Sequence, residues 1–83
     1  MITADELVPG MSAKITALSS SPQEERLTAM GCVPGTLIKL EFTAPSGDPM
    51  AFNVEGYLLG LRKSEAKLLV VEPIKKTWLI TLP

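Results

Sequence analysis

The part of the sequence that decides the fold is one stretch of ten residues, Arg26-Leu27-Thr28-Ala29-Met30-Gly31-Cys32-Val33-Pro34-Gly35. Gly31 predicts the end of a helix, because glycine adopts the left-handed conformation found just past a helix without steric cost. Met30 is then the C-cap residue. Cys32 is expected to pack over Leu27, as apolar residues commonly do across such a cap. The chain must therefore leave the helix at this point.

Flanking signals place the start of this helix and the turn after it. Ser21 and Glu24 have the spacing of a capping box, and Pro22 suits the first helical position because its missing N–H group would lack a partner there. After the helix, Pro34 presets its own φ, and Gly35 supplies the positive φ of a type II turn. A helix of about two to three turns is unstable alone in water, so it must pack on the remaining chain.

The remaining chain has the period-two alternation of apolar and polar residues that is typical of β-strands. The predicted strands are residues 12–17, 37–42, 50–55, 68–71 and 77–82, with 58–61 as a sixth candidate. Ile38, Leu40 and Phe42 are expected on one face, and residues 37–42 and 50–55 are expected to form an antiparallel hairpin. The sequence thus predicts a mainly β single domain over residues 1–83, a small β-barrel with one short α-helix after the first strand.

One Pro-Gly turn occurs twice, 25 residues apart. Val8-Pro9-Gly10 precedes Lys14-Ile15 just as Val33-Pro34-Gly35 precedes Lys39-Leu40. Because such a turn aims the next strand into a curved sheet, we interpret it as one turn-and-strand device used twice. The repeat is too short and too solitary to indicate a solenoid.

Composition argues against catalysis. The chain has 83 residues, a net charge of −1, one cysteine and no histidine. Without histidine, the commonest general base and metal ligand is missing and Cys32 has no imidazole to activate it, so we expect no enzyme, cofactor or metal site. A lone cysteine fits a reducing compartment, and no apolar run is long enough to span a bilayer, so we expect a cytoplasmic protein.

The side chains favour protein contact over other kinds of binding. Nucleic acid would need a basic face with stacking rings, and a solvated rim explains the basic residues better: Arg62, Lys63, Lys67, Lys75 and Lys76. A groove for proline-rich peptides needs aromatic residues, which make up 5% of the chain. Leu58, Leu79 and Ile80 cannot all point inward with their neighbours, which predicts an apolar surface for a partner. Burial by the terminal segments is the competing explanation.

Several short blocks, in order and correctly spaced over about residues 7–71, resemble the FeoA family of bacterial ferrous iron uptake. They are Arg26-Leu27, Met30-Gly31, Pro34-Gly35, Gly47-Asp48-Pro49, Gly56, Leu61-Arg62 and Glu65-Ala66. The resemblance implies an SH3-like barrel. It also implies a non-enzymatic accessory protein that contacts the cytosolic side of FeoB, the membrane transporter with a G-protein domain, and that reaches the membrane only through this partner.

The resemblance directs attention to two sets of residues. The expected partner-binding set is Met30, Gly31, Val33, Pro34, Tyr57, Leu58 and Leu59. The expected structural corner is Arg26, Leu27, Gly31, Pro34, Gly35 and Glu65, in which Arg26 and Glu65 make supporting contacts. Two departures from the family pattern are small: Cys32 replaces a usual aliphatic residue, and Gly60 replaces a common alanine.

Other functions compete with the transport role. The main alternative is a stand-alone domain that senses a small ligand or a metal. The same domain type also ends metal-dependent repressors resembling the diphtheria toxin repressor, but no helix-turn-helix region is expected in the few residues before the domain. Residues 77–82, which include Trp78, lie past the FeoA-like blocks and are expected to form an extra barrel strand or an arm for self-association.

Overall fold

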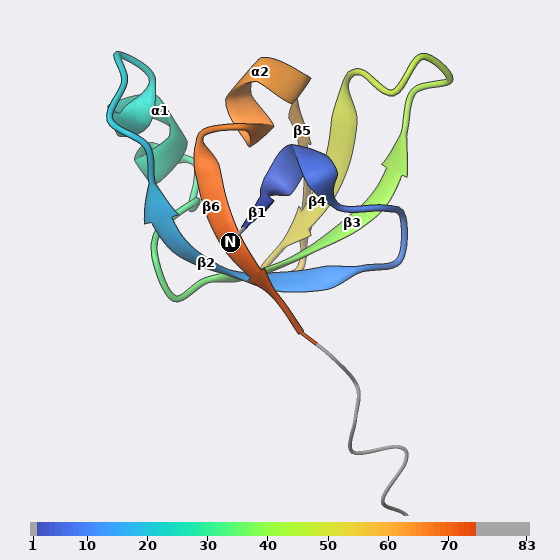
Figure 1. Ribbon diagram of the computed structural model, residues 1–83, viewed down its shortest axis with the longest axis horizontal. Helices are drawn as coiled ribbons and strands as arrows, with labels where there is room; N and C mark the ends of the chain where they lie inside the picture. The colour runs from blue at the N-terminus through green and yellow to red at the C-terminus, as the bar shows by residue number, and fades with distance from the viewer. Residues whose placement is uncertain (1, 75–83) are drawn as a thin grey trace, which may run out of the picture.

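One antiparallel sheet forms the framework of the computed structural model, which describes residues 2–74. Its six strands are β1 (Ile2–Thr3), β2 (Ser12–Leu18), β3 (Leu37–Thr43), β4 (Met50–Val54), β5 (Tyr57–Leu61) and β6 (Leu69–Pro73). They lie in the order β1-β6-β2-β3-β4-β5 (Figure 1). Three short helical segments join them: the 3-10 helix η1 (Ala4–Glu6), α1 (Glu24–Ala29) and α2 (Lys63–Ala66). The predicted mainly β class and the β3–β4 hairpin are confirmed.

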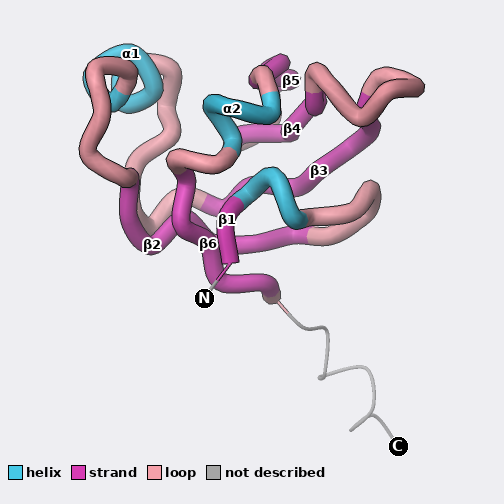
Figure 2. The backbone as a smooth tube through the Cα atoms, turned by 45° about the horizontal axis from the view of Figure 1, so that its top comes forward, coloured by secondary structure: helices cyan, strands magenta, loops and turns pink. Residues whose placement is uncertain are grey.

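Two parts of the predicted architecture are wrong. Within residues 2–74 the barrel is not closed, because the edge strands β1 and β5 do not pair with each other. Instead α2 contacts both η1 and β5 and lies between the two edges (Figure 2). The helix α1 follows the second strand rather than the first, since β1 is a two-residue strand, too short to show an alternating pattern. The predicted strand at 77–82 lies outside the described residues.

The repeated Pro-Gly turn gives the centre of the sheet an approximate two-fold symmetry. Both turns close with a hydrogen bond from the fourth N–H to the first carbonyl, of 3.0 and 3.1 Å. The Gly10 N–H then donates to the Leu40 carbonyl at 2.7 Å, and the Gly35 N–H donates to the Ile15 carbonyl at 2.7 Å. Each turn is thus anchored on the strand that follows the other turn, which aligns β2 with β3.

The end of α1 matches the prediction. Met30 is the C-cap, and Gly31 has a φ of +96°. The Gly31 N–H donates to the Thr28 carbonyl and the Cys32 N–H to the Leu27 carbonyl, both at 3.0 Å, which is the bond pair of a Schellman motif. The side chains of Cys32 and Leu27 are both fully buried in the core.

The predicted start of α1 is wrong by two residues. The helix begins at Glu24 with Gln23 as its N-cap, and the Ser21 hydroxyl accepts a hydrogen bond from the Gln23 N–H at 3.1 Å. The Glu24 N–H donates to the Ser21 carbonyl at 3.2 Å, so these residues form a turn before the helix. The turn thus satisfies the N–H groups of Gln23 and Glu24.

The core lies on the concave side of the sheet, under α1 and α2. Its largest fully buried side chains are Phe52, Ile15, Leu27, Leu40, Leu61, Leu69, Val54, Val71 and Cys32. Phe42 is expected from the alternation to share a face with Ile38 and Leu40, which are buried, but it is 56% exposed. The register of β3 on β4 shifts between Leu40 and Phe42, and the extra residue turns Phe42 to the outer face of the sheet.

Candidate functional site

The corner between α1 and α2 is held by charged groups. The Arg26 guanidinium forms an ion pair with the carboxylate of Glu65, which is 7% exposed. The other Glu65 oxygen accepts a hydrogen bond from the Arg62 N–H at 2.8 Å. The hydrogen bond from Arg26, followed by that from the Arg62 backbone, lowers the pKa of Glu65 below its ordinary value. Glu65 therefore stays ionised at neutral pH and fastens α1 to α2.

A second contact joins α1 to β5. The hydroxyl of Tyr57, at the start of β5, donates to the Met30 carbonyl at the end of α1. A Cβ atom at Gly31 would lie only 2.7 Å from the same hydroxyl oxygen, so any other residue there would have to displace this hydroxyl in addition to adopting the positive φ. The structure thus brings together three residues of the expected partner-binding set from two distant parts of the chain.

Leu58 points away from this corner. Residues of β5 alternate between the faces of the sheet: Leu59 pairs with the buried Phe52 and packs against the core, whereas Leu58 faces outward. Leu58 is 56% exposed, and Tyr57 on the inner side is 47% exposed. The expected partner-binding set is therefore divided between two faces of one edge strand.

The outer face of β3, β4 and β5 carries an open apolar groove. We call its centre the outer patch and define it as Phe42, Ala51, Leu58 and Gly60, which line one groove. Ala51 is opposite Phe42 on one side and Gly60 on the other. Sequence reasoning missed Phe42 because nothing in the alternation reveals the bulge that turns it outward.

The last two residues of the expected partner-binding set lie in the turn between α1 and β3. Val33 is half-buried and Pro34 is exposed. Their turn is held against β2 by the Gly35 N–H bond described above. They continue the surface of Met30 and Gly31 along the chain and are not part of the outer patch.

The described residues include exposed apolar side chains suited to protein contact, and their titratable side chains give little support for a chemical role. Burial, and then the Glu65 charge, raise the pKa of the Cys32 thiol, so this thiol is protonated at neutral pH. Within residues 2–74, no group of three or more cysteine, aspartate or glutamate side chains is arranged to hold a metal ion. No helix in this part of the chain is long and apolar enough to cross a membrane.

The fold and its corner define an SH3-like domain, and comparison with known proteins gives its family. The FeoA domain model matches residues 2–73. A FeoA-like protein from Clostridium acetobutylicum has 38% identity and a TM-score of 0.85, over 90% of this chain and 88% of that one. Iron(II) transport protein A from Clostridium thermocellum has 39% identity and a TM-score of 0.83, over 88% of this chain and 46% of that one.

A third structure connects the family to the SH3-like fold. FeoA from Stenotrophomonas maltophilia, in complex with zinc, has 28% identity and a TM-score of 0.76, over 87% of this chain and 91% of that one. That protein is described as a prokaryotic SH3 domain protein and as a candidate activating factor of ferrous iron transport. The present chain belongs to the FeoA family, which is associated with ferrous iron transport.

Proposed function

We propose that this chain is a non-enzymatic, cytoplasmic accessory protein of ferrous iron uptake that contacts a FeoB-like transporter on its cytosolic side. Membership of the FeoA family supports the link to iron transport. The protein reaches the membrane through the transporter and binds no nucleic acid, in keeping with its net charge of −1.

The observation that carries the proposed contact is the outer patch beside β5, an edge strand of the sheet. Phe42 and Leu58 are each 56% exposed on the outer face. β5 is the last strand of the sheet, so within residues 2–74 one side of its backbone has no neighbouring strand. An extended segment of a partner can pair with such an edge and place an apolar side chain against the patch. The proposed contact residues are Phe42 with Met30, Gly31, Val33, Pro34, Tyr57, Leu58 and Leu59.

The remaining corner residues have a supporting role in this proposal. Arg26 and Glu65 hold α1 against α2, and the Tyr57 hydroxyl holds the end of α1 against β5. Leu27, Pro34 and Gly35 shape the helix end and the turn. The edge strand is thereby presented in one fixed position, which lowers the ordering cost of binding a partner.

Regulation follows if the domain binds one conformation or nucleotide state of the transporter more tightly than the others. A ligand shifts a conformational equilibrium only by its difference in affinity for the two states, and equal affinity shifts nothing. The domain would then act by changing which state of the transporter is populated, without any chemical step of its own.

Iron uptake in cells that lack this chain tests the proposal. The wild-type chain should restore uptake, and Leu58→Asp and Phe42→Asp should not, because each places a charge in the apolar contact. Leu37→Asp is the matched control, since Leu37 is 55% exposed on the outer face but does not line the outer patch. Normal uptake without the chain, or equal loss from all three variants, would contradict the proposal.

The alternative is a small-ligand or metal sensor, and the zinc complex of the Stenotrophomonas relative is the observation that favours it. Equilibrium dialysis of the purified chain against ferrous iron, and separately against zinc, distinguishes the two. A sensor requires stoichiometric binding of one of these ions, whereas an accessory protein requires neither.

A further inference from the structure

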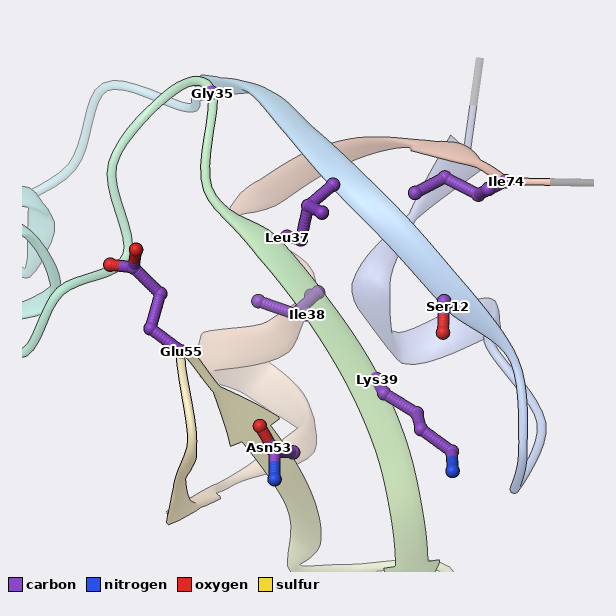
Figure 3. A pocket seen from close by; sticks show the side chains of 8 residues that line it. All are labelled: Ser12, Gly35, Leu37, Ile38, Lys39, Asn53, Glu55 and Ile74. Carbon is purple, nitrogen blue, oxygen red and sulfur yellow. The ribbon is translucent and has the colours of Figure 1, made fainter.

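A second apolar groove lies on the outer face, away from the outer patch. We call it the Leu37 groove; its lining is Ser12, Gly35, Leu37, Ile38, Lys39, Asn53, Glu55 and Ile74 (Figure 3). Leu37 stands at its centre and is 55% exposed, so it offers apolar surface to a segment that covers the groove. In the strand register Leu37 is opposite Lys14 of β2, and its neighbour Lys39 is opposite Ser12.

The described chain ends inside this groove. Ile74 follows β6, its N–H donates to the Ser12 carbonyl at 2.9 Å, and its side chain is 42% exposed. Figure 3 shows Ile74 and Leu37 on either side of β2, as the strand order requires. Ile74 lines the Leu37 groove but not the outer patch. The chain after Ile74 therefore starts next to the Leu37 groove.

The sequence after Ile74 has the composition to cover such a groove. Residues 75–83 are two lysines followed by a mostly apolar run that contains Trp78, Leu79, Ile80 and Leu82. Adjacent strands are about 4.8 Å apart, so the path from β6 across β2 to Leu37 on β3 is about 10 Å. Four extended residues span about 13 Å, and Trp78 is four residues after Ile74. Trp78 can therefore reach Leu37.

We propose that residues 75–83 of the same chain occupy the Leu37 groove, with the Trp78 indole over Leu37. Connection to Ile74 keeps this segment at a high effective concentration at its own groove, which favours it over a second copy or a distant surface. The neighbouring Lys39 ammonium is attracted by the face of an indole ring. This inference extends beyond the transport role and does not depend on it.

The single tryptophan of the chain makes a direct test available. Trp78 fluorescence of the full chain is compared with that of a synthetic peptide of residues 75–83, in emission wavelength and in quenching by acrylamide. The chain should emit at shorter wavelength and be quenched less than the peptide. Leu37→Ser should move both values toward those of the peptide. Leu58→Ser, at an equally exposed leucine, should leave both unchanged.

Three results would overturn the assignment. Identical fluorescence of chain and peptide would show a segment in solvent. A shift caused by Leu58→Ser and not by Leu37→Ser would place the segment on the outer patch. A short-wavelength emission that is lost on dilution would assign the groove to a second copy. Far-ultraviolet circular dichroism checks that each variant is folded. If Leu37→Ser does not fold, the test is repeated with Leu37→Thr, because threonine has a high strand preference.

Discussion

The side chains on the inner face of the sheet are held by contacts within the protein, whereas several large apolar side chains on the outer face are exposed to solvent. On the inner side, an ion pair and a tyrosine hydrogen bond tie α1 to α2 and to β5, and Gly31 combines a positive φ with room for the tyrosine hydroxyl. On the outer side, Leu37, Phe42 and Leu58 are more than half exposed. The inner residues are explained by the fold itself. The outer leucines and phenylalanine contribute little to the stability of the fold. Binding of another protein or of another segment of this chain therefore explains their apolar character better.

The largest loss of stability is expected at Gly31. Gly31→Ala forces an L-residue into the left-handed region, which costs about 1–2 kcal/mol, and also displaces the Tyr57 hydroxyl, whose hydrogen bond contributes about 1 kcal/mol. Gly35→Ala is the matched control: Gly35 has the same φ of +96°, but a Cβ there would meet nothing within 4 Å. Urea unfolding should show the larger loss for Gly31→Ala. Equal losses would mean that the contact with Tyr57 does not matter.

A somewhat smaller effect is expected at Glu65. Glu65→Gln removes the charge that pairs with Arg26 and should lower the free energy of unfolding by about 1–2 kcal/mol, a typical value for hydrogen bonds to charged groups. Glu72→Gln, at an exposed glutamate, should change it by less than about 0.5 kcal/mol. Thermal or urea unfolding of both variants checks this difference. If the two substitutions cost the same, the inner corner does not depend on the ion pair.

The pH dependence of stability should identify the same carboxylate. The pKa of Glu65 is lowered in the folded protein relative to its value of about 4.3 in an unfolded chain. Its stabilising contribution is therefore complete above that unfolded value and is lost as the pH falls through the folded pKa. The stability difference between the wild-type chain and Glu65→Gln should shrink as the pH is lowered from 7 to 3. A difference that is constant over this range would contradict the assignment.

The smallest effect on stability is expected on the outer face. Leu58→Asp replaces a side chain that is 56% exposed, and such surface substitutions usually change the free energy of unfolding by no more than about 0.5 kcal/mol. The same variant should abolish the proposed contact with the transporter. Parallel measurement of unfolding and of iron uptake would separate the two effects. A large loss of stability in Leu58→Asp would show that the outer patch supports the fold.

Local rules predicted the parts of the fold that depend on neighbouring residues. The helix end at Gly31, the two Pro-Gly turns and the β3–β4 hairpin all follow from glycine, proline and period-two patterns. The open sheet was not predicted, because the two-residue strand β1 has no pattern of its own and its partner β6 comes from the other end of the described chain.

The candidate site was harder to predict for a related reason. Tyr57 and Leu58 are adjacent in sequence but face opposite sides of β5, and Phe42 reaches the outer face only through a bulge. The contact between Tyr57 and Met30 joins residues 27 positions apart in the chain. Such contacts depend on strand register and sheet curvature, which no short stretch of sequence records.

Direct binding to the transporter is the measurement that tests the central claim. The purified chain and its Leu58→Asp and Leu37→Asp variants would be titrated into the cytosolic region of a FeoB-like transporter, in each nucleotide state of its G-protein domain. We expect the wild-type chain and Leu37→Asp to bind one state about tenfold more tightly than another, a difference of about 1.4 kcal/mol, and Leu58→Asp not to bind. Equal affinity of the wild-type chain for every state, or undiminished binding by Leu58→Asp, would contradict it.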